Sequence, residues 1–270
     1  MTRGKRFLTE FDMKIAFFDS GIGGLSVLHH AMKILPNEKF IFYADEDNVP
    51  YGTKTRAEIL KLVDAAFKFL TAQNVGAIVV ACNTATSVAV CKMREKYSLP
   101  IIGMEPAVKV ALDLFPQKKV LVTATEITIR GEKIKKLIQK LHAENLVELC
   151  SLQNLVNFAE NQEFNSVDVE KYLREKFSAY DLKNFSSIVL GCTHFNYFKD
   201  TMKKILPEMK ILDGNEGTLN QLIRLTNLQV GEGKKNPPVE YFYSGRRVTS
   251  EKELSRLENY LQRLDKMYLI

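Results

Sequence analysis

The sequence predicts an α/β fold of two similar domains, each with a mainly parallel central sheet flanked by helices. Short runs of β-branched and aromatic residues alternate with segments whose apolar residues recur at helical spacing. These short runs are apolar on both faces, as strands are when helices cover both sides of a parallel sheet. At 270 residues, the chain is long enough to build one large core or two modest ones.

Eight segments have the composition of buried strands. In chain order they are residues 15–18, 40–43, 77–81, 101–102, 120–123, 147–149, 188–190 and 211–212. Helical segments lie between them. Residues 57–70 carry Ile59, Val63 and Phe67 on one face, and residues 134–141 repeat the same spacing.

Two stretches of the chain resemble each other. Residues 77–84 (AIVVACNT) and residues 187–193 (SIVLGCT) both read as a buried strand whose end delivers a Cys, then a Thr and a helix. Each is preceded by an earlier strand that ends in small polar residues, at Asp19-Ser20 and at Thr125. Because ligands of open α/β sheets bind beyond the carboxyl ends of the strands, two such units would place one thiol on each side of a cleft.

Cys82 and Cys192 are the candidate reactive thiols. Cys82 begins a predicted helix, whose free N–H groups and dipole would bind a carboxylate and lower the pKa of the thiol. Cys192 is followed by His194, which could hold or exchange a proton beside it. The alternative for each is a small buried side chain that only packs. We assign Cys91 and Cys150 to packing in the core or at the surface.

The loop from Asp19 to Gly24 (DSGIGG) follows a strand and opens a helix, as phosphate-binding loops do. It lacks the full dinucleotide fingerprint, because Ser26 stands where the last Gly or Ala belongs. A carboxylate at Asp19 would also repel phosphate. We therefore expect Asp19 to orient an ammonium group or assist a thiol, although a nucleotide-binding enzyme stays open as an alternative.

The bulk composition excludes several classes of protein. The net charge of +6 is spread over helical faces, so we expect no nucleic-acid partner. No apolar run is long enough to span a bilayer, and residues 1–13 read as an extension without the apolar core of a secretory signal. The four cysteines form no CxxC pair, which favours reduced thiols in a cytoplasmic protein over a disulfide framework or a zinc ribbon.

Taken together, five motifs resemble those of the glutamate racemases, within the aspartate/glutamate racemase superfamily. They occur in the order and spacing typical of that family and cover residues 14 to about 214. The motifs are FDSGIGGLS from Phe18, PYG from Pro50, ACNTAT from Ala81, EPA from Glu105 and LGCTHF from Leu190.

The resemblance implies a cofactor-independent racemase that interconverts L- and D-glutamate through two cysteine acid/bases and supplies D-glutamate for peptidoglycan. It implies a first domain of residues 14–103 and 214–270, a second of residues 104–213, an active site in the cleft between them, and a homodimer. Cys82 and Cys192 would be the acid/base thiols, with Asp19 and His194 as auxiliary catalytic groups that also contact substrate. The other implied substrate-binding residues are Ser20, Pro50, Tyr51, Gly52, Asn83, Thr84, Thr125, Thr128, Glu160 and Thr193.

Some positions depart from the family pattern. Asn196 stands where a Pro is common, and the loop after Thr125 carries Ile127 and Thr128 where Gly-Thr is usual. These departures concern how the side-chain carboxylate of the substrate is bound. They leave the thiols untouched.

Three rival interpretations stay open besides the nucleotide-binding one. Aspartate racemases of the same superfamily commonly carry His after Cys-Asn-Thr-Ala, where this chain has Thr86, so the resemblance favours glutamate. A non-catalytic protein that binds an acidic metabolite could use the same cleft. A zinc site formed by Cys82, Cys192 and His194 fits by ligand type, but we expect no bound metal.

Overall fold

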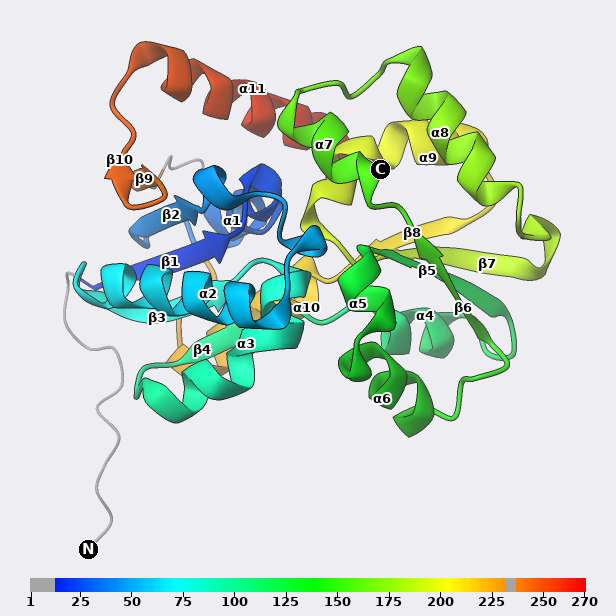
Figure 1. Ribbon diagram of the computed structural model, residues 1–270, viewed down its shortest axis with the longest axis horizontal. Helices are drawn as coiled ribbons and strands as arrows, with labels where there is room; N and C mark the ends of the chain where they lie inside the picture. The colour runs from blue at the N-terminus through cyan, green and yellow to red at the C-terminus, as the bar shows by residue number, and fades with distance from the viewer. Residues whose placement is uncertain (1–12, 232–236) are drawn as a thin grey trace, which may run out of the picture.

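The computed structural model describes residues 13–231 and 237–270, so the N-terminal extension lies, apart from Met13, outside the described residues. Within these residues, ten strands form two sheets (Figure 1). The six-stranded sheet has the order β10-β9-β2-β1-β3-β4, and the four-stranded sheet has the order β6-β5-β7-β8. Every neighbouring pair is parallel except β9 and β10. The predicted α/β class is therefore confirmed.

The strands agree closely with the eight predicted segments. Their bounds are β1 Lys14–Asp19, β2 Phe40–Ala44, β3 Val75–Val80, β4 Ile101–Gly103, β5 Lys119–Ala124, β6 Val147–Ser151, β7 Phe185–Leu190 and β8 Lys210–Asp213. Two further strands, β9 Val239–Tyr243 and β10 Arg246–Arg247, were not predicted. β9 pairs in parallel with β2 and so extends the six-stranded sheet with residues from the end of the chain.

Helices cover the faces of both sheets. The α-helices are α1 Leu25–Ile34, α2 Arg56–Thr71, α3 Asn83–Lys96, α4 Val108–Leu114, α5 Glu126–Arg130, α6 Glu132–Lys140, α7 Asn154–Glu160, α8 Val167–Phe177, α9 Lys199–Ile205, α10 Asn215–Thr226 and α11 Glu251–Met267. Short 3-10 turns are η1 Ile22–Gly24, η2 Glu46–Asn48, η3 Tyr51–Thr53, η4 Leu182–Asn184 and η5 Thr193–Phe198.

Local sequence explains where several helices begin. α2 starts at a capping box, in which the Thr55 side chain accepts from the Glu58 N–H and the Glu58 carboxylate accepts from Thr55. α11 begins at Ser250, whose hydroxyl accepts from the Glu253 N–H and donates to the Glu253 carboxylate. The helices predicted over residues 57–70 and 134–141 correspond to α2 and α6.

The internal similarity of the sequence appears as a repeated strand order. The order β2-β1-β3-β4 in one sheet matches β6-β5-β7-β8 in the other. β3 and β7 therefore occupy equivalent places, and each delivers its Cys at its carboxyl end. This duplication, argued from sequence alone, accounts for the arrangement of the site below.

α11 connects the two sheet units. Figure 1 shows it (red) running from the side of β9 and β10 toward α7. Its buried face includes Leu257, Tyr260 and Leu264, which belong to a hydrophobic core shared by residues of both sheets. The last helix of the chain therefore packs across the boundary between the sheets.

Candidate active site

The two predicted thiols lie at matching strand ends. Cys82 follows β3 and caps the N-terminus of α3, where its Sγ accepts from the Ala85 N–H at 3.4 Å. Cys192 follows β7 and precedes η5. Both side chains are buried, with exposed fractions of 5% and 7%. The two similar sequence segments predicted a Cys at the carboxyl end of each strand, and the structure places both cysteines there.

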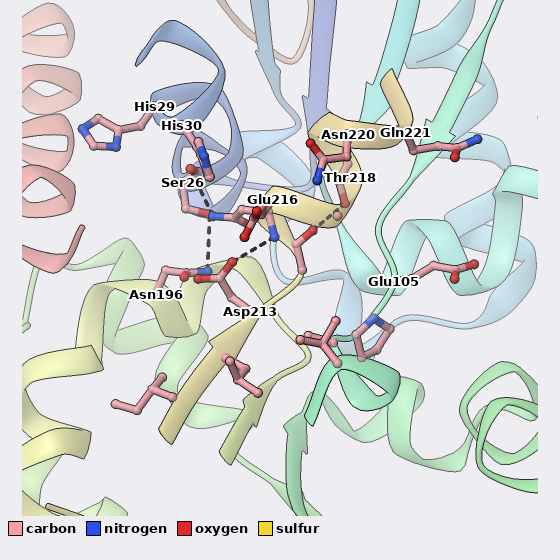
Figure 2. Close-up of a pocket in the computed structure, with 18 of the residues that line it drawn as sticks. Ser26, His29, His30, Glu105, Asn196, Asp213, Glu216, Thr218, Asn220 and Gln221 are labelled. Carbon is pink, nitrogen blue, oxygen red and sulfur yellow. Dashed lines mark hydrogen bonds between the residues drawn. The ribbon is translucent and has the colours of Figure 1, made fainter. Parts of the chain in front are cut away.

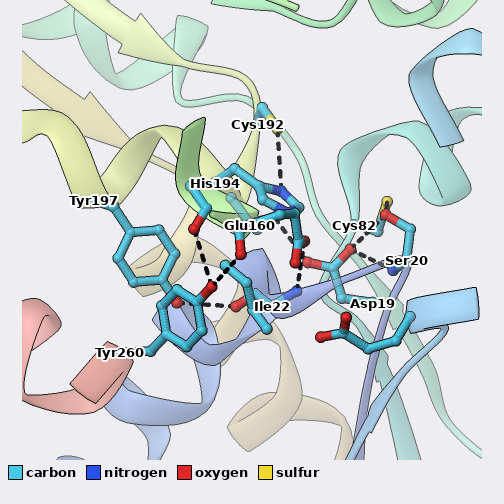
Figure 3. Close-up of polar contacts among 12 residues, drawn as sticks. Asp19, Ser20, Ile22, Cys82, Glu160, Cys192, His194, Tyr197 and Tyr260 are labelled. Atoms are coloured by element: carbon cyan, nitrogen blue, oxygen red, sulfur yellow. Dashed lines mark hydrogen bonds and ion pairs between the residues drawn. The ribbon is translucent and has the colours of Figure 1, made fainter. Parts of the chain in front are cut away.

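Asp19, at the end of β1, lies between the groups that surround the two thiols (Figure 3). Its Oδ1 accepts from the Ser20 N–H at 2.6 Å and from the Ser20 hydroxyl at 3.1 Å. The same hydroxyl lies 3.5 Å from the Cys82 Sγ. The other carboxylate oxygen, the Asp19 Oδ2, accepts from the hydroxyl of Thr193, the residue after Cys192, at 3.0 Å. One carboxylate therefore ties together the loops that carry both cysteines.

Burial decides the ionisation of this region. It raises the pKa of Asp19, and contacts with His194, Cys82 and Thr193 offset only part of that rise. It also raises the pKa of Cys82 well above its ordinary value, with the charge of Asp19 adding to the effect. The expectation that the helix N-terminus lowers the pKa of Cys82 is therefore wrong in direction, because the single N–H bond from Ala85 is outweighed by lost hydration.

Cys192 has a different partner, the imidazole of His194. The His194 Nδ1 lies 3.8 Å from the Cys192 Sγ, and the Nε2 lies 2.7 Å from the Glu160 Oε1. Burial by itself would lower the pKa of His194, but its contacts with Cys192 and Glu160 raise the pKa well above its ordinary value. A protonated ring can donate to both neighbours at once.

Gly21, just before η1, and Gly23, within η1, allow the six-stranded unit to approach His194 and Glu160 of the other unit closely. A Cβ on Gly23 would lie 2.3 Å from the His194 Nδ1, and one on Gly21 would lie 2.0 Å from the Glu160 Oε1. The Ile22 N–H donates to that same Oε1 at 3.0 Å. The glycine-rich loop, which resembles a phosphate-binding loop in sequence, is thus used for close approach to His194 and Glu160.

A cluster of threonine hydroxyls lies beside Cys82. The Thr84 Oγ1 is 2.9 Å from the Thr125 Oγ1 and 3.5 Å from the Thr128 Oγ1, and Thr125 donates to Thr128 at 3.0 Å. All three side chains are buried, as is Asn83. Within the described residues, the Asn83 Oδ1 has no hydrogen-bond partner. This leaves a buried acceptor next to the thiol.

The Pro50-Tyr51-Gly52 turn closes another side of the same region. The peptide bond before Pro50 is cis, and the Tyr51 hydroxyl donates to the Asp45 Oδ2 at 2.6 Å. A Cβ on Gly52 would lie 2.4 Å from the Gln153 Oε1, which comes from the other sheet unit. The turn therefore packs directly against the segment that enters α7.

The remaining cysteines stand apart from the site, as expected. Cys91 is exposed on α3 and Cys150 is buried on β6, and all four cysteines are free thiols. Across residues 13–231 and 237–270, no group of three or more His, Cys, Asp or Glu side chains is arranged to hold a metal ion. Over the same residues, no helix has the length and apolar character needed to cross a bilayer.

A separate cavity of about 1060 Å³ opens between α1, α10 and the loop that precedes α4 (Figure 2). His29, His30, Glu105 and Asp213 line it, whereas neither of the two candidate thiols does. Asn196, which follows His194 and Phe195, also lines it. Its Nδ2 donates to the Ser26 Oγ at 3.5 Å and to the Thr193 O at 3.1 Å, so it helps fix η5.

Several residues around the site gave no signal in the sequence. Arg256 and Tyr260 of α11 contact Glu160 from the far end of the chain, and Asp45 and Gln153 hold the Tyr51-Gly52 turn. None belongs to a motif. Arg256, Tyr260 and Gln153 are far in sequence from the residues they contact, whereas Asp45 lies six residues before Tyr51. Contacts between distant segments require the fold, so the sequence alone could not have found them.

Comparison with known proteins gives consistent matches. A family model described as Asp/Glu/hydantoin racemase matches residues 26–222. The chain is 52% identical over 263 residues to a glutamate racemase of Campylobacter curvus, covering 94% of this chain and 98% of that protein. It is 41% identical over 256 residues to glutamate racemase 2 of Bacillus subtilis, covering 94% and 97%.

Solved structures agree. The glutamate racemase of Francisella tularensis in complex with D-glutamate superimposes with a TM-score of 0.77 at 31% identity, covering 94% of this chain and 95% of that one. The Escherichia coli glutamate racemase in complex with L-glutamate and the activator UDP-MurNAc-Ala gives a TM-score of 0.78 at 26% identity, covering 93% and 95%.

Proposed function

This chain belongs to the Asp/Glu/hydantoin racemase family, and from that premise we propose that it is an isomerase that interconverts L- and D-glutamate. The observation that carries the proposal is the pair of buried thiols at the equivalent ends of β3 and β7, with Asp19 between their loops. The identities of 41% and 52% to glutamate racemases over nearly the whole chain support glutamate as the substrate.

Racemisation needs two groups rather than one. A proton leaves Cα from one face and another returns to the opposite face, which a single base cannot easily reach. One thiol must therefore be a thiolate while the other is protonated, and the two enantiomers use the enzyme in opposite protonation states. By resemblance, Cys82 removes the proton of D-glutamate and Cys192 that of L-glutamate.

The surroundings of the thiols suit this division of work. The Ser20 hydroxyl and Asp19 lie beside Cys82, and the His194–Glu160 pair lies beside Cys192. Burial and the charge of Asp19 raise the pKa of Cys82, and the charge of Cys192 adds to that rise. A buried site also strengthens each electrostatic interaction with the carbanion, since little water screens it.

The polar groups around the thiols supply contacts for a small zwitterion. The hydroxyls of Ser20, Thr84, Thr125, Thr128 and Thr193 can donate to carboxylates, as can the free N–H groups at the start of α3. The unpartnered Oδ1 of Asn83 can accept from an ammonium group, as can Asp19. Tyr51, with Pro50 and Gly52, closes the site beside Cys82. These assignments require no cofactor.

We further propose that the first domain comprises residues 14–103 and 214–270, that the second comprises residues 104–213, and that the enzyme acts as a cytoplasmic homodimer that supplies D-glutamate for peptidoglycan. The two separate sheets and the return of β9 to the first of them support the domain division.

The reaction is tested by incubating the purified protein, with no added cofactor, with L-glutamate in D₂O and with L-aspartate in parallel. Optical rotation and NMR of the Cα position follow inversion and deuterium uptake. We expect both for glutamate alone. Uptake with aspartate alone would instead favour an aspartate racemase. Absence of exchange with either amino acid, from folded protein with reduced thiols, would refute the proposal and favour a binding protein for acidic metabolites.

A further inference from the structure

Arg256 of α11 joins two carboxylates that come from opposite sides of the site. Its Nη1 donates to the Glu46 Oε1 at 3.1 Å. Its Nη2 donates to the Glu160 main-chain O at 3.2 Å and lies 3.4 Å from the Glu160 Oε2. Glu46 belongs to η2, next to the six-stranded sheet, whereas Glu160 ends α7 of the other unit. One guanidinium therefore spans the two units beside the site.

The position of this guanidinium is fixed. Its carbon lies 5.9 Å from the centroid of the Tyr243 ring and 5.5 Å from that of Tyr260, distances at which a cation is attracted to an aromatic face. The Tyr260 hydroxyl donates to the Glu160 main-chain O at 2.8 Å. The end of α7 is thus held by two residues of α11, of which only Arg256 carries a charge.

The charge matters because Glu46 and Glu160 face each other with little water. Their side chains are 16% and 12% exposed. Burial raises the pKa of Glu46, and the negative charge of Glu160 raises it further, while Arg256 opposes both effects. Without a cation between them, the two carboxylates would repel each other, and Glu160 is the one that must stay on His194.

We propose that Arg256 is a positioning residue that holds the Glu160 carboxylate on His194 and thereby keeps the imidazole in place for proton transfer at Cys192. This inference rests on the proposed racemase function. It extends the chain of contacts from Cys192 through His194 and Glu160 to a residue on the last helix, as Figure 3 shows for its first members.

A purely structural role for Arg256 is less consistent with the contacts, because α11 is anchored elsewhere. Arg263 is buried and donates to the Tyr197 main-chain O at 2.7 Å and to Asp200 at 2.6 Å. Asp265 accepts from His29 and Lys33. Arg256, by contrast, is partly exposed and contacts Glu160, the carboxylate that pairs with His194.

Within the described residues, charged and titratable groups that act on His194 come from several elements. Cys192 precedes η5, Glu160 ends α7, Asp19 ends β1 and Glu46 lies on η2. The raised pKa of His194 depends on Cys192 and on Glu160. If Glu160 is displaced, the pKa of His194 should therefore fall.

The test compares Arg256→Met, Glu46→Gln and the double variant with the unmodified enzyme. Lys252→Met, an exposed position on the same helix, is the matched control. The chain has four histidines, so the ring signals of His194 can be followed by NMR and assigned with a His194→Gln variant. If Arg256→Met does not fold, Arg256→Lys is used for the same test. Its single ammonium group replaces a planar guanidinium that donates to both Glu46 and Glu160.

Kinetics supply the second readout. The two enantiomers have equal free energy in water, so kcat/KM must be the same in both directions. An effect on one thiol therefore appears as a change in the ratio of the KM values for L- and D-glutamate. We expect Arg256→Met to lower kcat/KM about tenfold, to raise the ratio of KM for L- over D-glutamate, and to lower the pKa of His194.

The double variant decides the mechanism. Removing the charge of Glu46 removes the repulsion, so the pKa of His194 should recover and kcat/KM should return to within about threefold of its original value. Unchanged NMR titration in Arg256→Met would overturn the proposal, as would an equal loss in the single and double variants. Because the titration needs no substrate, it tests the role of Arg256 even if the unmodified protein does not racemise glutamate.

Discussion

Replacing Gly23 by alanine tests whether the close approach of the two sheet units sets the geometry of the site. Gly23 lies in η1, directly against the segment that carries Cys192. An added Cβ would lie 2.3 Å from the His194 Nδ1 and 2.7 Å from the Thr193 Oγ1. Ordinary van der Waals contact begins at 3.4 Å, so this segment must retreat by about 1 Å.

A retreat of that size should affect catalysis more than folding. Strain from an extra methyl group in a packed site costs about 1–3 kcal/mol, which a chain of this size can tolerate. Misplacing a reacting group by about 1 Å can cost about a hundredfold in rate. The displaced loop carries Thr193 and His194, the partners of Asp19 and Cys192. We therefore expect Gly23→Ala to fold and to lose about two orders of magnitude in kcat/KM.

The assay is the steady-state racemisation of L-glutamate, with thermal unfolding measured in parallel. Gly217→Ala in α10 is the matched control, because an added Cβ there meets no atom within 4 Å. The control should keep its activity and gain up to about 1 kcal/mol in unfolding free energy, since glycine disfavours helix. Normal kcat/KM in a folded Gly23→Ala variant would refute the reasoning.

Three further predictions follow from the contacts of the site. Cys82→Ser and Cys192→Ser should each lower the racemisation rate by at least about a hundredfold, because a hydroxyl is a far weaker acid than a thiol; a near-normal rate in either would refute the two-thiol mechanism. The pKa of His194 is raised on folding, so the stability that this group contributes is complete below about pH 6.5 and is lost as the pH rises toward the folded pKa. Urea unfolding from pH 6.5 to 8 should therefore show the unfolding free energy declining by at most about 1.4 kcal/mol per pH unit, and His194→Gln should remove this decline. Equal slopes in the two proteins would contradict the prediction. Thr84→Val should lower the unfolding free energy by about 1 kcal/mol and raise KM, since it removes the hydroxyl contacts with Thr125 and Thr128; unchanged values of both would argue against a role for the threonine cluster.

Much of the fold could be predicted because strand composition and repetition are local properties of the chain. The two similar segments around Cys82 and Cys192 predicted equivalent strand ends, and β3 and β7 occupy such ends. β9 was missed because its place between β10 and β2 depends on a return of the chain to the first sheet, which no local pattern encodes.

The electrostatics of the site were predicted less well. A strand-to-helix junction suggested a lowered pKa for Cys82, but the direction is set by burial and by Asp19, and burial depends on packing by distant segments. The chain of contacts from Arg256 to Cys192 shows the same limit. Its members are far apart in sequence, so only the folded chain reveals that the last helix supports a residue of the site.

The central claim is that two opposed thiols exchange protons with Cα, and the most direct test is the early distribution of deuterium. L-glutamate is incubated in D₂O, the reaction is stopped at low conversion, and the two enantiomers are separated and analysed at Cα. Two bases predict that the D-glutamate formed carries deuterium while the remaining L-glutamate keeps its protium. Substantial protium in the D-glutamate, returned by the same group that removed it, would contradict the account.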